Sequence, residues 1–424
     1  MHANYSTKVK FQKLRMKKHL FGLFLFLMIS TQVWAQGLSI SGVVKDKRGE
    51  TLPGAGVYLS GYKTATVTNM DGKYVLANLK PGNYDILVEM MGYLPYTKNV
   101  IIADKAMTID IVLSENTIQL QEVVIRVDPN RQGYIDLFKE FFIGKTPNAQ
   151  KCKLLNPQAL SVDYDDKAKT LTVKSNEFLV IENKALGYRL KYMLQFFEYN
   201  YQTRIVYYAG LPNFEELKGS ASKKRQWIKN REVAYYGSSQ HFFKSLYQGR
   251  SKEEGFVINK LIKLENSSRP PDSLINAEIA KLKKQQHGGM RIGSAENDSL
   301  SYWLKVKEMP KKISTLNRSD VLTDTLVKQQ YKDLKTLNFK DDLYLIYTKE
   351  RETNAYTNTS GHSVSRPLDM PNYQISIVHL LEGPVHFYAS GGIFQPKSFL
   401  FEGFWAFEKI ADMVPMDYIP LPLK

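Results

Sequence analysis

Residues 42–93 read GVVKDKRGETLPGAGVYLSGYKTATVTNMDGKYVLANLKPGNYDILVEMMGY, and this stretch decides the fold of the first domain. Apolar and polar residues alternate in short runs, and turn residues interrupt the runs roughly every 8–12 residues, as in a β-sandwich. The clearest turn is Asn69-Met70-Asp71-Gly72, because an Asp-Gly pair supplies the positive φ that tight hairpins need. The pattern predicts seven strands: Leu38–Val44, Val57–Leu59, Thr64–Thr68, Tyr74–Ala77, Tyr84–Met90, Asn99–Ile102 and Thr108–Leu113.

Residues 37–126 resemble the carboxypeptidase-regulatory-like domain, which implies a seven-stranded, transthyretin-like β-sandwich. Residues 120–125 resemble the segment that ends this module in TonB-dependent outer-membrane receptors. One departure, Lys63-Thr64-Ala65, falls in a loop where the family carries glycine. In peptidases and receptors the module is an accessory, so the resemblance implies no chemistry of its own. The motifs that carry it are Gly42-Val43-Val44-x-Asp46, Gly49-x-x-Leu52-Pro53-Gly54-Ala55-x-Val57, Thr68-x-x-Asp71-Gly72-x-Tyr74, Pro81-Gly82-x-Tyr84 and Gly92-Tyr93.

The first 35 residues have the organisation of a secretory signal peptide. Leu20–Ile29 is an unbroken apolar run, which is shorter than the roughly 20 residues that span a bilayer. Val33-Trp34-Ala35 offers the residues that a signal peptidase reads, so cleavage is expected after Ala35. The basic region that precedes the apolar run consists of Lys8, Lys10, Lys13, Arg15, Lys17 and Lys18. The sequence therefore predicts an exported protein, in the periplasm or associated with the outer membrane. A retained membrane anchor is the alternative.

The chain is basic, with a formal net charge of +16, and removal of the six cations before residue 36 leaves +10. This charge favours an anionic glycan, lipopolysaccharide or a membrane surface as partner, besides another envelope protein. No zinc-finger spacing or RNA-binding aromatic signature occurs, so nucleic acid is not expected. The basic runs 223–225 and 281–284 fall in expected helices and are interpreted as solvated helix faces.

Cys152 is the only cysteine, so no intramolecular disulfide is possible. The neighbouring Lys151 and Lys153 would favour a reactive thiolate. The apolar residues that follow favour a small buried side chain, which is the preferred interpretation.

Residues 127–146 are expected to form a connector helix. Asp128 would cap it and Pro129 would occupy its first turn. One apolar stripe runs along this helix, formed by Tyr134, Phe138, Phe141 and Phe142. This stripe predicts packing against the following domain, with peripheral membrane association as the alternative.

Residues 147–424 are expected to form a larger, β-rich α+β domain, which makes the whole chain mainly β. Residues 188–196 give the clearest alternation, and helices are expected at 221–234 and 239–247, the second capped by Ser238. Residues 266–299 are polar and predict a flexible insertion. The other predicted strands are 160–164, 171–173, 204–208, 302–306, 343–347, 374–380 and 385–388.

Four segments of this region also resemble, more loosely, a tail that accompanies the module in exported proteins without a known activity. They are Phe138–Cys152, Glu182–Tyr188, Asn230–Phe242 and Phe404–Met413. The resemblance brings no activity with it.

No catalytic, cofactor-binding or metal-binding residue is assigned from the sequence. His379, Glu382 and His386 offer three zinc ligands, but Gly383-Pro384 reads as a hairpin turn between two strands. Ser238 and His241 lie close together without the Gly-x-Ser-x-Gly elbow of a serine hydrolase, and a helix cap explains Ser238. A single Asp71 in a turn does not make a calcium site. If an active site exists, Arg231, Glu232 and His241 are the first residues to mutate.

The sequence thus favours a non-catalytic, exported protein of the cell envelope that acts in binding or docking. Its expected partner is an envelope protein, an anionic glycan or a lipid head group, and its oligomeric state is open. The competing hypothesis is a hydrolase, a peptidase or glycosidase, whose site in the C-terminal domain is set by the fold.

Overall fold

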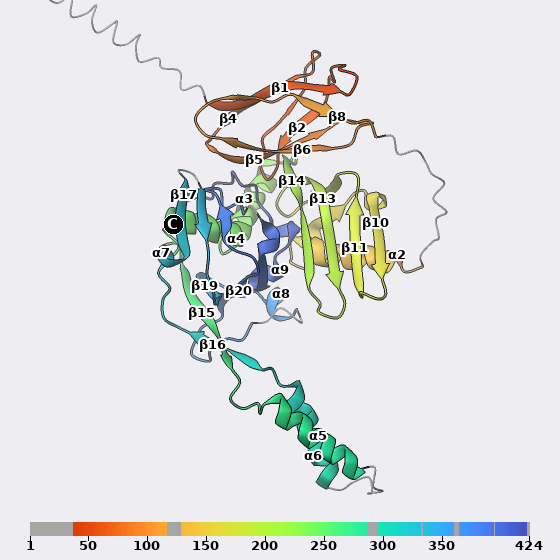
Figure 1. Ribbon diagram of the computed structural model, residues 1–424. Helices are drawn as coiled ribbons and strands as arrows, with labels where there is room; N and C mark the ends of the chain where they lie inside the picture. The colour runs from red at the N-terminus through yellow and green to blue at the C-terminus, as the bar shows by residue number, and fades with distance from the viewer. Residues whose placement is uncertain are drawn as a thin grey trace, which may run out of the picture.

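A computed structural model describes residues 37–116, 129–286, 295–331, 334–359, 364–393 and 395–421. The expected signal peptide, the expected helix cap Asp128 and the receptor-like segment 120–125 lie outside these residues. Figure 1 shows a β-sandwich on top of a larger two-part body, from which a pair of helices projects. No described helix is both long and apolar enough to cross a membrane.

The N-terminal domain is the expected β-sandwich, made of two four-stranded sheets. One sheet has β1 (Leu38–Asp46) beside β4 (Lys73–Leu79), with β7 (Met107–Thr108) and β8 (Ile111–Leu113) on the other side. The second sheet has the order β3 (Ala65–Val67), β2 (Gly56–Leu59), β5 (Gly82–Glu89) and β6 (Tyr96–Ile102). The inner faces enclose a core of alternating apolar residues, among them Ile40, Val57, Leu76 and Ile86, as expected for a sandwich.

The expected last strand, 108–113, is divided into β7 and β8, so the sandwich contains eight strands within residues 37–116 where seven are expected. Asp110 lies at the break, where its carboxylate accepts a hydrogen bond from the Val43 N–H at 2.9 Å. Gly42 lies opposite, and a Cβ built on it would stand 1.8 Å from the Ile109 carbonyl oxygen. The close approach of the two chain segments therefore depends on a glycine in β1.

Helix α2 (Arg131–Phe142) joins the sandwich to the second domain and begins later than expected. Its N-cap is Asn130, whose side chain forms no capping hydrogen bond. The predicted stripe is present: Phe138 and Phe142 are fully buried, and Tyr134 and Phe141 pack beside them against the core of the second domain.

A six-stranded sheet forms the first half of the second domain. Its strand order is β10 (Leu160–Asp165), β11 (Thr170–Ser175), β13 (Tyr188–Asn200), β12 (Leu179–Asn183) and β9 (Cys152–Leu154), and β14 (Val206–Glu216) also pairs with β13. The predicted alternation of residues 188–196 places Tyr188, Leu190, Tyr192 and Leu194 in the core. This sheet confirms the β-rich character of the region.

The second half contains a five-stranded sheet and a smaller three-stranded one. The larger sheet has the order β16 (Lys312–Asn317), β15 (Phe256–Glu265), β19 (Asp342–Arg351), β20 (Tyr373–Leu380) and β22 (Phe399–Gly403). The smaller one has the order β17 (Val327–Tyr331), β18 (Leu334–Leu337) and β21 (Val385–Phe387). Helices α3 (Ala221–Tyr235) and α4 (Ser239–Gln248) match the two expected helices. Residues of α2, α3, α4 and both large sheets share one core.

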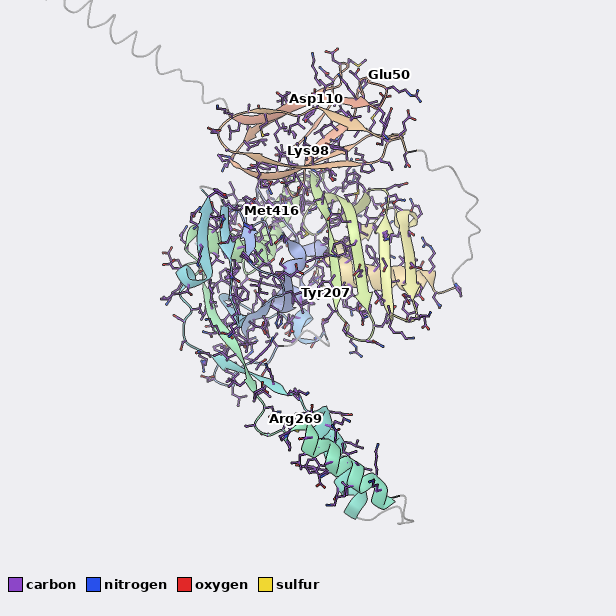
Figure 2. All side chains as sticks on the ribbon, in the orientation of Figure 1. Glu50, Lys98, Asp110, Tyr207, Arg269 and Met416 are labelled. Carbon is purple, nitrogen blue, oxygen red and sulfur yellow. The ribbon has the colours of Figure 1, made fainter. Side chains whose placement is uncertain are left out.

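Three expectations about this half are wrong. Residues 302–306 are not a strand but part of α6 (Ala295–Glu308). The expected loop at 266–299 contains α5 (Asp272–Gln286) and the beginning of α6, and the two helices pair in the projecting arm of Figure 1. Arg269 is labelled at the base of this arm in Figure 2. Leu300, Trp303 and Val306 pack on Ile275 and Ile279. Their spacing of three residues is that of a helix, and it outweighs the short apolar alternation of residues 302–306. The Gly383-Pro384 turn joins strands of different sheets and is therefore not a hairpin.

The sandwich contacts the second domain through backbone and side-chain groups. The Gly61 N–H donates to the Pro212 carbonyl at 2.6 Å, and the Met416 N–H donates to the Gly61 carbonyl at 2.7 Å. Figure 2 labels Met416 beneath the sandwich. Lys191 donates to the Tyr58 hydroxyl at 3.1 Å and pairs with a carboxylate of the sandwich, Glu89.

Gly42→Ala is expected to destabilise the sandwich by about 3 kcal/mol, because its methyl group overlaps the Ile109 carbonyl and overpacking has this order of cost. The matched control is Gly133→Ala in α2, where a Cβ meets nothing within 4 Å. The control should raise stability by about 0.5–1 kcal/mol, because alanine is the better helix former. Urea unfolding of both variants measures the difference, and equal midpoints would contradict the strand contact described.

Candidate functional site

The β12–β13 turn, residues 183–187, is the place where the loosely recognised segments meet. The Asn183 side chain is fully buried; its amide donates to the Ala411 carbonyl at 2.8 Å and its oxygen accepts the N–H groups of Ala185 and Leu186. Asn183 thereby ties the first sheet to the last turns of the chain. We call this place the Asn183 junction (residues 183–187, 227–231 and 411).

Helix α3 binds the same turn through side chains spaced along one face. Trp227 donates to the Lys184 carbonyl at 3.0 Å, and Asn230 donates to the Ala185 carbonyl at 2.7 Å. Arg231 donates to the Leu186 carbonyl at 2.7 Å, and its guanidinium lies 3.8 Å from the centre of the Tyr188 ring. It also pairs with Glu216 at 3.2 Å. Arg231 is therefore buried, and its guanidinium already contacts neighbouring backbone and side-chain groups.

The serine and histidine that the sequence offered for catalysis hold the start of α4. Ser238 is the N-cap: its hydroxyl accepts the His241 N–H at 3.2 Å and donates to the Tyr235 carbonyl at 2.6 Å. This confirms the capping interpretation. The Trp405 indole donates to the Gly237 carbonyl at 2.7 Å, so the preceding turn is held to the C-terminal segment as well.

His241 lies in an aromatic cage formed by Tyr235, Tyr236, Phe256 and Tyr347. Its Nδ1 accepts the Gly237 N–H at 3.2 Å, and its Nε2 lies 3.4 Å from a Glu254 oxygen. Burial lowers the pKa of His241 to about 4, although Glu254 acts in the opposite direction. The imidazole is therefore neutral at pH 7 and joins the cage to Glu254. Glu232 is half-buried and follows Arg231 in the chain. Among the described contacts, no hydrogen bond or ion pair joins the side chains of Arg231, Glu232 and His241.

The three residues offered for zinc also lie apart. His379 bridges two carboxylates, with Nδ1 at 3.0 Å from Asp342 and Nε2 at 3.0 Å from Glu402. The hydrogen bond to Glu402 raises the pKa of His379. Glu382 is exposed in the following turn, and His386 lies in β21 of another sheet. Within the described ranges, no group of three or more His, Cys, Asp and Glu side chains is arranged to hold a metal ion.

Cys152 and Asp71 have structural surroundings. Burial raises the pKa of the Cys152 thiol to about 12, so the flanking lysines do not activate it, and the side chain is half-buried rather than buried. Asp71 is exposed in its turn and pairs with Lys73 at 3.6 Å.

A basic groove of about 710 Å³ lies on the outer side of the Asn183 junction. Its walls are α3, the β12–β13 turn and the end of β14. Cations outnumber carboxylates among its side chains: the groove is lined by Lys151, Lys184, Arg189, Lys218 and Lys223, against Glu182 and Glu216. The volume falls within the range of ligand sites, roughly 300–1,000 Å³.

The ion pairs within this basic groove leave an excess of positive charge. Glu182 is shared by Lys184 at 3.5 Å and Arg189 at 3.6 Å. Lys151, Lys218 and Lys223 make no ion pair with any side chain that the structure describes. The Nε of Arg189 is buried and has no hydrogen-bond partner among the described residues. The Arg189 side chain as a whole is 43% exposed, so an anion in the groove would meet the accessible part of this side chain and not the buried Nε.

The sequence did not single out this groove. Its cations come from four separate segments, and only Lys223 belongs to a basic run, which was interpreted as a solvated face. That interpretation describes Lys224 and Arg225, which are exposed and do not line the groove. No spacing rule links the lysines, because the fold alone brings them together.

Acid should destabilise the protein through His241. Since its folded-state pKa lies below the unfolded value of about 6.5, the unfolded chain binds the extra proton, and stability falls as the pH drops from about 6.5 towards 4. The loss should approach about 3 kcal/mol. Thermal unfolding between pH 4 and 8 should show a smaller acid loss for His241→Gln than for the wild type. His386→Gln is the control, and equal acid losses in the wild type and His241→Gln would contradict the assignment.

Comparison with known proteins places the first domain in a family. Residues 40–125 match the family model of the CarboxypepD_reg-like domain. Over 110 residues the chain is 34% identical to the TonB-dependent receptor SusC of Bacteroides thetaiotaomicron; the match covers 26% of this chain and 10% of the receptor. The chain therefore matches only a small part of that relative.

Solved structures are similar over about a fifth of the chain. A cohesin–X-dockerin complex of Acetivibrio cellulolyticus shares 18% identity over 19% of this chain and 58% of that one, with a TM-score of 0.18. A streptococcal ancillary pilin shares 17% identity over 20% and 34%, with a TM-score of 0.18. Chlorocatechol 1,2-dioxygenase of Pseudomonas putida shares 17% identity over 19% and 61%, with a TM-score of 0.16. The family match, together with the two-sheet sandwich that strands between residues 38 and 113 form, identifies residues 40–125 as a carboxypeptidase-regulatory-like domain.

Proposed function

We propose that this chain is a non-catalytic, exported binding protein of the cell envelope, and that its second domain holds an anionic group in the basic groove. The ligand chemistry is a phosphate or carboxylate carried by a glycan or a lipid head group. The observation that carries the proposal is the excess of cations in the basic groove, which five basic side chains and two carboxylates line.

Two further observations support this function. The first domain is related to part of a TonB-dependent receptor, which supports an outer-membrane or periplasmic setting where phosphorylated glycolipids are plentiful. The residues that the sequence offered for hydrolysis, Ser238 and His241, do not line the groove, and their hydrogen bonds hold α4. Binding therefore agrees with the geometry better than hydrolysis does.

Charge removal inside the groove should weaken anion binding. The triple variant Lys184→Gln, Lys218→Gln, Lys223→Gln is expected to bind purified lipopolysaccharide roughly tenfold more weakly, at about 0.5 kcal/mol for each exposed charge pair. The matched control is Lys224→Gln, Arg225→Gln, Lys229→Gln, which removes the same charge from residues of α3 outside the groove. Isothermal titration of the chain from residue 36 onward measures both.

Two added ligands separate the sources of the anion. Dephosphorylated lipopolysaccharide should lose binding if lipid phosphates are recognised, whereas an acidic polysaccharide without lipid should keep it if sugar carboxylates are recognised. The proposal fails if the groove variant and its control bind all of these ligands equally well.

A further inference from the structure

A second cleft, of about 540 Å³, lies between the two large sheets and shares no lining residue with the basic groove. Two runs of consecutive residues form most of its walls: 203–208, which leads into β14, and 399–403, which is β22. Figure 2 labels Tyr207 at this boundary between the two parts of the body. The remaining lining residues are Phe141, Val364, Trp405, Ala406, Glu408 and Lys409.

Consecutive residues of one strand can line a cleft together when the edge of the strand faces it. Successive side chains point to opposite faces of a sheet, so a strand that presents a face contributes only every second residue. Both strands are edge strands: β14 pairs with β13 alone, and β22 ends its sheet, within the described part of the chain. The cleft is therefore bounded by two strand edges.

The register identifies the backbone groups of β14 that point into the cleft. The Asn200 N–H donates to the Ile205 carbonyl, and the pairing continues with Glu198 opposite Tyr207. Because backbone groups alternate in direction along an antiparallel strand, those of Val206 and Tyr208 point away from β13. No hydrogen bond between described residues uses them.

The same reasoning applies to β22. The Leu381 N–H donates to the Ser398 carbonyl, so the backbone groups of Phe399 and Phe401 point away from β20. Unpaired edges of this kind are templates for an added strand.

The other half of the β14 edge is already covered by a segment of the sandwich. The Gly61 N–H donates to the Pro212 carbonyl, and the Phe214 N–H donates to the Tyr62 carbonyl at 3.4 Å. A turn of the sandwich, residues 60–63, therefore already donates to and accepts from this edge at residues 212–214, and these hydrogen bonds stop before Val206.

The side chains around the free edge suit a peptide. Aromatic rings of Phe141, Tyr207 and Phe401 provide apolar contact, and Glu408 and Lys409 add polar groups that form no ion pair with a described side chain. Burial raises the pKa of Glu408 and lowers the pKa of Lys409 to about 8. The carboxyl group of Glu408 and the ammonium group of Lys409 can both form hydrogen bonds with the backbone groups of a peptide.

We propose that this cleft binds an extended peptide segment of a partner protein, which adds as a strand to the free edge of β14 at Val206 and Tyr208. Main-chain hydrogen bonds would supply affinity, and the aromatic walls would select alternate side chains of the peptide. The free backbone groups recur at the two-residue repeat of a strand, which favours a peptide over a saccharide.

The test uses a random heptapeptide phage library, selected on the immobilised chain from residue 36 onward. Val206→Pro removes one outward N–H at the first residue of β14, a position where a strand tolerates proline. Val206→Ala is the matched control, because it loses more side-chain packing and keeps the N–H. Selected peptides should bind Val206→Pro roughly five- to tenfold more weakly than the wild type, and Val206→Ala nearly as well as the wild type.

Amide hydrogen exchange of the wild-type protein gives a readout that does not depend on how the variants fold. Added peptide should slow exchange at Val206 and Tyr208. The proposal is overturned if no peptide is enriched, if Val206→Pro and Val206→Ala bind the peptides equally, or if the slowed amides lie elsewhere.

Discussion

The buried side-chain amide of Asn183 connects three parts of the second domain that are far apart in the sequence. It closes the β12–β13 turn through Ala185 and Leu186, and it reaches the Ala411 carbonyl near the end of the chain. A buried amide that loses a partner costs about 1–3 kcal/mol, so the turn, the sheet and the C-terminal segment hold one another in place. Arg231 and Trp227 then attach α3 to the same turn.

The basic groove is the outer surface of the Asn183 junction. Lys184 extends from the turn whose carbonyl receives the Trp227 indole, and Lys223 lies one helical turn before Trp227. The β12–β13 turn and α3 thus each carry both kinds of group: those that hold the helix to the turn, and the lysines that line the groove. Three of the four segments that loosely resemble tails of other exported proteins contribute residues to the junction, where their hydrogen bonds hold the turn, α3 and the C-terminal segment together.

The sequence predicts the sandwich well because every local signal there agrees. Turn residues such as Asp71-Gly72 and the alternation of β1 and β5 indicate the same fold as the family motifs. Prediction fails in the arm, where the alternation of Tyr302, Leu304 and Val306 resembles a strand although the first two are exposed on α6. Only the packing of Trp303 and Val306 on α5 decides between the two periods.

Neither of the two proposed binding sites could be predicted from the sequence, for two different physical reasons. The cations of the basic groove come from positions 151, 184, 189, 218 and 223, and long-range packing alone determines their proximity. The cleft beside β14 exists because β14 and β22 lie at the edges of their sheets. Strand order decides which strands are edge strands, and the sequence pattern of a single strand does not reveal that order. Ser238 and His241 are candidates in the sequence because they lie close together in the chain. In the structure, both form local hydrogen bonds at the start of α4.

We propose that the basic groove holds an anion beside Arg189. Anomalous diffraction from crystals of the chain soaked in selenate, an anion with a strong scattering signal, tests it directly. The account predicts a peak in the groove within hydrogen-bonding distance of the Arg189 guanidinium. Selenate found only at other surfaces, with the groove empty, would contradict the account.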